Sequence, residues 1–311
     1  MVVTIWVIIT VTFFLFRLIP GDPVSMLITE NVSMEAQEMI RKQWGLDKPQ
    51  YEQYLIYMEN LVQGKFGTSI YYKYPVWEIL IPRLFNTLIL MGTSMLVAIL
   101  IGGIAGAYLG WKRGARSEKG GVIFILFLRS IPIFWMGILL LMVFTYWLRL
   151  FPGGGMHQTG FLSQSFIGNY LNLDFLKHLV LPFLCYLLYN IGDPLMIMRS
   201  SMLEIRGEDF LTLLQAKGLS ESSVMKQCAR NAILPLITYV GVLVGYAFSG
   251  QVLLETVFSW PGLGREIVLA VFKRDYAVVQ GSFVLMAFVA VVMNFLVDLS
   301  YGLLDPRIVY K

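Results

Sequence analysis

Six long apolar stretches constrain the fold of this chain more than any other feature of its sequence. A helix needs about 20 mostly apolar residues to cross the roughly 30 Å hydrocarbon core of a membrane. The stretches lie at residues 1–19, 84–110, 121–147, 177–198, 232–254 and 281–304, and the first is barely long enough to cross. This pattern predicts an all-α integral membrane protein with six transmembrane helices.

The composition agrees with a membrane protein. Hydrophobic residues make up 57% of the chain and charged residues only 14%, with a mean hydropathy of +0.68. A soluble domain carries about 25% charged residues. The first apolar stretch has no basic region before it and no small-residue cleavage site, so we interpret it as a membrane anchor. The expected surroundings are the lipid bilayer, and no nucleic-acid partner is expected.

The positions of the basic residues predict the orientation. Lysine and arginine collect in the short cytoplasmic loops of membrane proteins. Here they follow the second and fourth stretches and occur in the tail: Lys112, Arg113, Arg116, Lys119, Arg199, Arg206, Lys217, Lys226, Arg230, Arg307 and Lys311. With six spans these regions share one face. We therefore expect a multi-pass protein of the cell (inner or plasma) membrane with both termini in the cytoplasm.

The expected organisation has three parts. Residues 1–19 form the first transmembrane helix, residues 20–83 an extracytoplasmic loop subdomain, and residues 84–311 a five-helix core with a cytoplasmic loop at about 200–231. In the first outer loop, Pro49 opens an amphipathic helix that Gly64 ends, and residues 34–44 predict a shorter one. Residues 255–280 predict a folded, turn-rich lid outside the membrane.

The loop between the fourth and fifth stretches predicts a helix, a glycine hinge and a second helix. Residues 208–217 indicate a short helix with Phe210, Leu213 and Leu214 on one side. Gly218 stands where a helix ends in a left-handed residue, and Ser220 is a good N-cap for a helix that runs toward Arg230. An ordinary amphipathic connector and an element that a partner pushes both fit this pattern.

Several motifs in order resemble one family. They are QAKGLS (215–220), RNA (230–232) with LP (234–235), RLIPGDP (17–23), GLDKP (45–49), GKFGTS (64–69), ETVFSWPGLG (255–264), RDY (274–276) and DPR (305–307). Together they resemble the permeases of dipeptide, oligopeptide and nickel ABC importers, of the first permease type with a large first outer loop. The resemblance covers nearly the whole chain.

The resemblance implies a type I ABC importer fold and a set of partners. These are a second homologous permease, two ABC ATPase subunits and an extracytoplasmic solute-binding protein. It implies a permease that imports di- or oligopeptides by alternating access; similar permeases carry nickel complexes, glutathione or oligosaccharides. It also implies that this chain is no enzyme and holds no cofactor, since ATP and magnesium bind to the ATPases. The sequence has no phosphate-binding Gly-x-x-x-x-Gly-Lys-Ser/Thr loop.

The resemblance also points to site residues. The candidates for coupling to the ATPases are Glu204, Arg206, Ala216, Lys217, Gly218 and Leu219. The candidates for an outer gate or a contact with the binding protein are Trp260, Pro261, Gly262 and Gly264.

Three charges fall inside the predicted spans. Arg129, Asp193 and Asp298 lie roughly 8–14 Å above the predicted cytoplasmic ends, at 1.5 Å per residue. Charges in a membrane are paired or lie in a wet cavity. We expect Arg129 to pair with Asp193 or Asp298, either to hold the bundle or to line the translocation path.

Other readings have weaker support. A membrane-embedded enzyme is the alternative from another class. It needs ionisable residues that converge at one depth near the interface, and only Arg129, Asp193 and Asp298 qualify, so we expect no catalytic residue. His157 and His178 are weak evidence for a metal, and none is expected. Cys185 and Cys228 suggest packing thiols. Gly102, Gly106 and Gly110, like Gly241, Gly245 and Ser249, form small faces for close helix contact, static or sliding.

Overall fold

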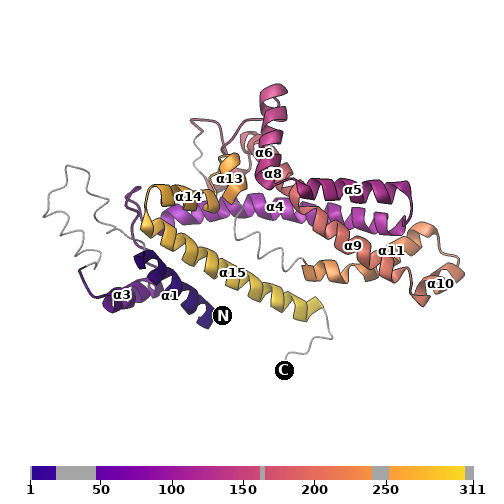
Figure 1. Cartoon of the computed structure of the whole chain (residues 1–311), viewed down its shortest axis with the longest axis horizontal. Coiled ribbons are helices and arrows are strands. Elements are labelled where there is room, and N and C mark those ends of the chain that lie inside the picture. The colour runs from indigo at the N-terminus through magenta and orange to yellow at the C-terminus, as the bar shows by residue number, and fades with distance from the viewer. Residues whose placement is uncertain (1, 19–46, 162–164, 240–251, 305–311) are drawn as a thin grey trace. The chain divides into compact units, whose positions relative to one another are not determined.

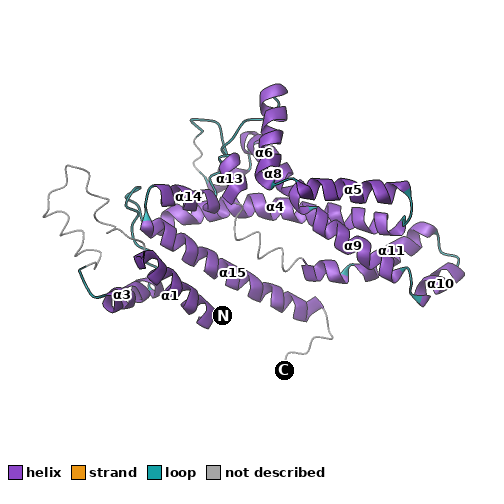
Figure 2. Cartoon of the chain, in the orientation of Figure 1, coloured by secondary structure: helices purple, strands orange, loops and turns teal. Residues whose placement is uncertain are grey.

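A computed structural model describes residues 2–18, 47–161, 165–239 and 252–304. These residues are mostly helical and contain no strand, which confirms the predicted all-α class (Figure 2). The helices are α1 (Val2–Leu18), α3 (Gln50–Val62), α4 (Val76–Trp111), α5 (Arg116–Ser130), α6 (Ile133–Leu140), the π-helix η1 (Leu141–Trp147), α7 (Phe166–Tyr170), α8 (Leu173–Asn190), α9 (Gly192–Ile205), α10 (Asp209–Ala216), α11 (Glu221–Ala232), α13 (Val252–Val257), α14 (Leu263–Phe272) and α15 (Tyr276–Leu304).

The chain divides into two compact units, each with its own packing. The amino-terminal unit combines Met1–Asn86 with Gly262–Val292, and the core unit combines Thr87–Pro261 with Met293–Lys311. The helices α4 and α15 contribute residues to both units.

Three of the described helices are long and apolar enough to cross a membrane. They are Val76–Trp111, Leu173–Ile205 and Tyr276–Leu296, at the places of the predicted second, fourth and sixth spans. The first predicted span is the 17-residue helix α1. Most of the fifth lies outside the described residues. The all-α membrane character is therefore confirmed, and the described spans account for part of the expected six.

The third predicted span is formed by a bent pair of helices rather than by one straight helix. The segments Arg116–Ser130 and Ile133–Trp147 are bent by 98° (Figure 1). Pro132 lacks an N–H group and disfavours the helical conformation in the residue before it. Ile131 is accordingly extended, with φ −85° and ψ 122°. The apolar run continues through the break, which is why hydropathy alone does not reveal it.

In the amino-terminal unit, the predicted amphipathic helix is confirmed as α3. Its aromatic side chains pack on α1: the Phe13 ring lies 5.3 Å from the rings of both Tyr54 and Tyr57, and the hydroxyl groups of Thr10 and Tyr54 are 2.7 Å apart. The helix predicted at residues 34–44 lies outside the described residues. Packing on a neighbouring apolar helix explains why α3 is stable although it is too polar to span.

The predicted turn-rich lid is instead mostly helical, formed by α13, α14 and the start of α15. In the amino-terminal unit, Asp275 is fully buried and accepts hydrogen bonds from the Ser69 hydroxyl and the Tyr71 N–H group. Arg83 Nε lies 2.5 Å from Glu266 Oε2. These contacts connect residues 266–275 to residues 69–83.

In the core unit, the glycine face of α4 packs directly on α9 and the residue before it. A Cβ atom added at Gly102 would lie 2.8 Å from the Ile191 carbonyl oxygen, and one at Gly110 would lie 2.6 Å from Met202 Cβ. One at Gly106 would overlap the Leu195 carbonyl oxygen. The predicted close approach is confirmed here, while Gly241, Gly245 and Ser249 lie outside the described residues.

This contact predicts that Gly106→Ala destabilises the chain. The added methyl group meets backbone, which cannot move aside like a side chain, and overpacking of this kind costs about 1–3 kcal/mol. Gly92→Ala is the matched control, because Gly92 lies on the same helix with nothing within 4 Å. Thermal denaturation of the detergent-solubilised chain should show a melting temperature lowered by several degrees for Gly106→Ala alone. Equal melting temperatures for both variants would contradict the packing argument.

Candidate functional site

The segment between α9 and residue 232 has the predicted helix–glycine–helix form. We call α10 and α11, with the turn between them, the α10–α11 hairpin. Gly218 has a φ of +72°, in the left-handed region that glycine adopts without strain. The Ser220 hydroxyl caps α11 by accepting a hydrogen bond from the Ser223 N–H group at 3.4 Å. The short connection thus holds the two helices in one fixed turn.

The hairpin is anchored by one apolar cluster. Leu214, Val224 and Cys228 are buried together with Met198 and Met202 of α9. This arrangement fixes which side of the hairpin faces the bundle and which side is free. A displacement of the hairpin is therefore passed directly to α9.

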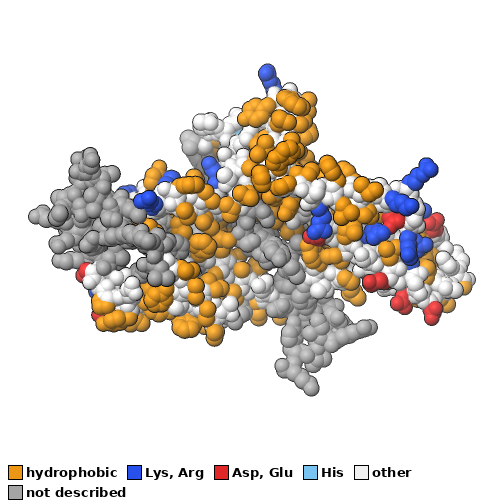
Figure 3. Space-filling model, in the orientation of Figure 1, with side chains coloured by type: hydrophobic (Ala, Val, Ile, Leu, Met, Phe, Trp, Pro, Cys, Tyr) orange, Lys and Arg blue, Asp and Glu red, His pale blue; other side chains and the backbone are white. Residues whose placement is uncertain are grey.

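The other side of the hairpin is exposed. All six predicted coupling residues are exposed in this chain: Glu204, Arg206, Ala216, Lys217, Gly218 and Leu219. Leu213 is 56% exposed, although sequence spacing placed it on the same side as the buried Leu214. Figure 3 shows charged side chains of both signs gathered at the end of the unit that holds α10 and α11. This exposed surface thus combines apolar Leu213 and Leu219 with charged side chains.

Trp111, at the end of α4, contacts both α11 of the hairpin and the connection between α9 and α10. Its indole N–H group donates to Glu221 Oε1 at 2.8 Å, and Lys112 Nζ lies 3.2 Å from the same oxygen. Both partners hold the pKa of Glu221 below its usual value, the tryptophan hydrogen bond most. Arg206 donates to the Trp111 carbonyl oxygen at 2.7 Å, with its guanidinium 5.4 Å from the ring centre. Arg206 thus has a partner within the chain, and sequence reasoning missed Trp111 because it only ends an apolar run.

A buried ion pair fixes the start of α5 to α9. Arg199 Nε donates to Glu118 Oε1 at 3.0 Å, and the Gly114 N–H group donates to Glu118 Oε2 at 2.6 Å. Only 7% of the Glu118 side chain is exposed. Breaking such a pair would leave a charge buried and uncompensated, so α5 and α9 are held together at this end.

Of the two carboxylates predicted as partners of Arg129, the structure pairs it with Asp193. Arg129 Nη1 lies 2.6 Å from Asp193 Oδ1, and the Tyr239 hydroxyl donates to Asp193 Oδ2 at 2.8 Å. The side chain of Asp298 lies outside the described residues. Gly192 makes room for the pair, since a Cβ atom there would lie 2.7 Å from Arg129 Cδ. Tyr239 and Gly192 were not predicted, because neither stands in a recognisable motif.

The outer-gate candidates lie in the interior of their units. Trp260 is fully buried in the core unit, with its ring 5.8 Å from that of Phe175. The backbone N–H group of Trp260 donates to the backbone carbonyl oxygen of Glu255. The buried carboxylate of Glu255 accepts a hydrogen bond from Thr87 Oγ1 at 2.6 Å. Gly262 and Gly264 are buried in the amino-terminal unit, and Pro261 is half-buried. In this conformation Trp260 supports the fold and has no surface to offer a partner.

The two histidines share one carboxylate. His157 Nδ1 lies 3.2 Å from Asp174 Oδ2, and His178 Nδ1 lies 3.4 Å from Asp174 Oδ1. Within the described part of the chain, no three histidine, cysteine or acidic side chains are arranged to hold a metal ion. Cys185 and Cys228 are free thiols, and both are buried.

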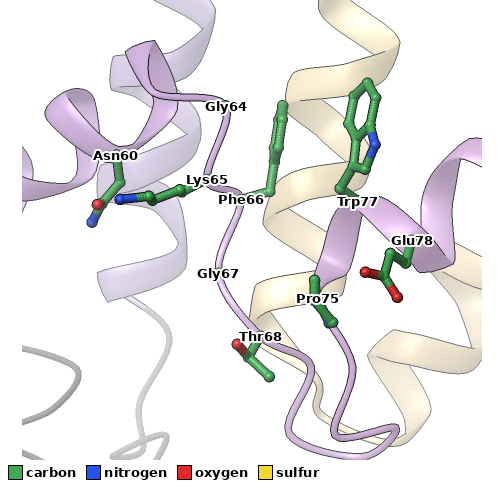
Figure 4. Close-up of a pocket in the computed structure, with 9 residues that line it drawn as sticks. All are labelled: Asn60, Gly64, Lys65, Phe66, Gly67, Thr68, Pro75, Trp77 and Glu78. Atoms are coloured by element: carbon green, nitrogen blue, oxygen red, sulfur yellow. The ribbon is translucent and has the colours of Figure 1, made fainter.

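The motif at residues 64–69 forms one wall of an open pocket of about 580 Å³ in the amino-terminal unit. Phe66 and Trp77 both line it, and Figure 4 shows their side chains side by side. Their ring centres are 5.9 Å apart. Asn60, Lys65, Thr68 and Glu78 supply its polar lining. Its openness makes it a surface feature of the unit rather than an enclosed ligand site.

Two family models cover nearly the whole chain. The model described as "Binding-protein-dependent transport system inner membrane component" matches residues 98–310, and the corresponding amino-terminal model matches residues 1–91.

Curated relatives match over almost their full length. The dipeptide transport system permease protein DppB of Escherichia coli K12 is 37% identical, covering 96% of this chain and 93% of the relative. The di/tripeptide transport system permease protein DppB of Pseudomonas aeruginosa is 38% identical, covering 96% and 92%. The oligopeptide transport system permease protein AppB of Bacillus subtilis is 36% identical, covering 96% and 93%. The chain therefore belongs to the family of inner-membrane components of binding-protein-dependent transport systems.

Proposed function

We propose that this chain is the permease subunit of an ATP-driven ABC importer of di- and oligopeptides. The α10–α11 hairpin is the single observation that carries the proposal. It is anchored to the bundle on one side and exposes Leu213, Lys217 and Leu219 on the other. The family membership and the names of the relatives support the solute class.

In the proposed assembly the chain pairs with a second, homologous permease. Two ATPase subunits, which bind ATP and magnesium, dock on the hairpins, and an extracytoplasmic binding protein delivers the solute. The hairpin and both termini then face the cytoplasm of a cell whose inner or plasma membrane holds the complex. The chain supplies the path and performs no chemistry on the solute.

The contacts within the core unit indicate how motion is transmitted. Movement of the hairpin reaches α9 through the apolar cluster around Leu214, and reaches α4 through Glu221 and Trp111. The Glu118–Arg199 pair carries it on to α5. Packed helices of this kind shift as rigid bodies between discrete arrangements, which is what alternating access requires.

Reconstitution tests the proposal directly. The chain is co-expressed with its companion permease, ATPases and binding protein, and the complex is placed in liposomes. We expect uptake of labelled dipeptide that needs ATP and is stimulated by the binding protein, while the purified chain alone binds no ATP. Dipeptide uptake without ATP, or no dipeptide uptake by the complete complex, would contradict the proposal.

Gly218→Val should uncouple ATP hydrolysis from uptake. A β-branched residue at φ +72° strains the turn by roughly 1–2 kcal/mol, and nothing within 4 Å adds a steric clash. We expect uptake per ATP hydrolysed to fall several-fold, with most of it retained in Gly218→Asn, which tolerates this conformation.

The matched control is Gly64→Val, which has the same backbone conformation and equally open surroundings in the other unit. Normal uptake per ATP in Gly218→Val at normal yield, or an equal loss in Gly64→Val, would count against the role of the hairpin.

Trp111 substitutions should show a graded loss of coupling. Trp111→Phe removes the hydrogen bond to Glu221 and keeps a ring beneath Arg206, whereas Trp111→Ala removes both contacts. Uptake per ATP should therefore fall by at least about twofold in Trp111→Phe, as expected for one lost exposed hydrogen bond, and further in Trp111→Ala. Trp147→Phe, at a 70% exposed position on η1, is the control. The measurement is ATPase activity and uptake on the same liposomes; equal ratios in all variants would exclude this connection.

A further inference from the structure

The Arg129–Asp193 pair lies at one end of each of its two helices, α5 and α9, and far from the opposite ends. Arg129 stands near the end of α5 and Asp193 in the first turn of α9. At 1.5 Å per residue, they lie roughly 18–20 Å along the helix from Arg116, the first residue of α5, and from Ile205, the last of α9. Both helices belong to segments apolar enough to cross a membrane. The pair therefore lies at a depth where lipid surrounds the outer surface of the protein.

The pair is nevertheless not covered by this chain. The side chains of Arg129 and Asp193 are 46% and 39% exposed. The Glu118–Arg199 pair differs, with 7% and 22% exposed, as expected for a purely structural contact. Charges that face hydrocarbon are expensive, and charged residues in membrane segments face a bundle interior or a water-filled cavity. The exposed side of Arg129 and Asp193 therefore faces away from lipid.

The surroundings hold the pair in place before any solute arrives. Arg129 stands at the carboxyl end of α5, where the helix dipole favours a positive charge. The break at Ile131–Pro132 creates this helix end. The Arg129 stem packs against Gly192, and Tyr239 orients the carboxylate. Broken helices place polar groups at solute sites in other transporters.

The chemistry of the pair matches a zwitterion. A guanidinium group has five N–H donors in a planar fork suited to a carboxylate, and in the described structure the only ion-pair partner of Arg129 is Asp193. We propose that Arg129, Asp193 and Tyr239 form a polar station on the translocation path, where Arg129 binds the terminal carboxylate of a passing peptide and Asp193 binds its ammonium group.

This proposal rests on the proposed function and adds a site and a ligand chemistry to it. The resident ion pair must open to admit the solute, so each new ion pair replaces part of an existing one. The net gain is small, and the peptide is held weakly. Weak binding suits a path, because a solute that binds tightly does not leave.

Thiol labelling in the assembled transporter tests whether water reaches the polar station. In a background with Cys185→Ala and Cys228→Ala, Arg129→Cys is compared with Phe127→Cys. Phe127 lies at nearly the same depth on the opposite side of α5 and is 61% exposed. The probe is the cationic reagent trimethylammonioethyl methanethiosulfonate, applied to the complex in nanodiscs. We expect modification at position 129 at least about tenfold faster than at 127, from the difference between water and lipid. Equal rates, or no modification at 129, would overturn the station.

Uptake of alanyl-alanine tests the role in transport. We expect Arg129→Gln and Asp193→Asn each to lower uptake about tenfold or more at unchanged complex yield, with partial retention in Arg129→Lys, which keeps the charge but not the fork. The double variant Arg129→Asp with Asp193→Arg restores an ion pair but presents the charges in reversed positions. It should remain defective, whereas full recovery would show a merely structural pair and overturn the station.

The two proposals fail in different ways. Wild-type complex that takes up alanyl-alanine with ATP, together with unaffected Arg129 and Asp193 variants, overturns the station and leaves the peptide importer intact. Wild-type complex that takes up no peptide overturns the proposed function, and the thiol experiment still decides whether the station is wet, because labelling requires no transport.

Discussion

The close contact between α4 and α9 is the constraint on which the rest of the core unit depends. Gly106 lets the two backbones meet, and no side chain fits between them. In a bilayer, packing of this kind drives association, since lipid is as apolar as the helices. Three further contacts depend on the position of α9 against α4. They are the Glu118–Arg199 pair, the apolar cluster that anchors the α10–α11 hairpin, and the Arg129–Asp193 pair. A shift of α9 would change all three together.

Much of this organisation is visible in the sequence because its signals are local. The hairpin is an example: a glycine after one amphipathic run and a serine before the next specify both helix ends, and Gly218 and Ser220 adopt the expected conformations. The glycine face of α4 also follows from a simple rule, that small residues permit close helix contact. The rule that a charge inside a membrane needs a partner predicts a carboxylate for Arg129, but it does not choose between Asp193 and Asp298.

The sequence does not reveal two kinds of feature. One is a bend within a continuous apolar run, and the other is a contact between residues far apart in the chain. Hydropathy does not reveal the 98° bend at Pro132, because the two helices on either side of it are together apolar enough to pass for one span. Trp260 looked like a surface contact because prolines and glycines around it suggest a loop, whereas the fold buries it completely. Tyr239, Gly192 and Trp111 acquire their roles only from residues 46, 63 and 110 positions away, respectively. Such contacts depend on how helices pack, which spacing along one helix does not determine.

The apolar exposure of the hairpin has a consequence for the cell. Leu213 and Leu219 are 56% and 38% exposed on a segment that we place outside the lipid. Exposure of such side chains to water is unfavourable. A copy of the chain with no ATPase bound therefore has an exposed hydrophobic patch of the kind that chaperones and proteases recognise. The residues that contact the ATPase in the assembled transporter would thus mark an unassembled chain for degradation. The amount of ATPase would then limit the amount of permease in the membrane.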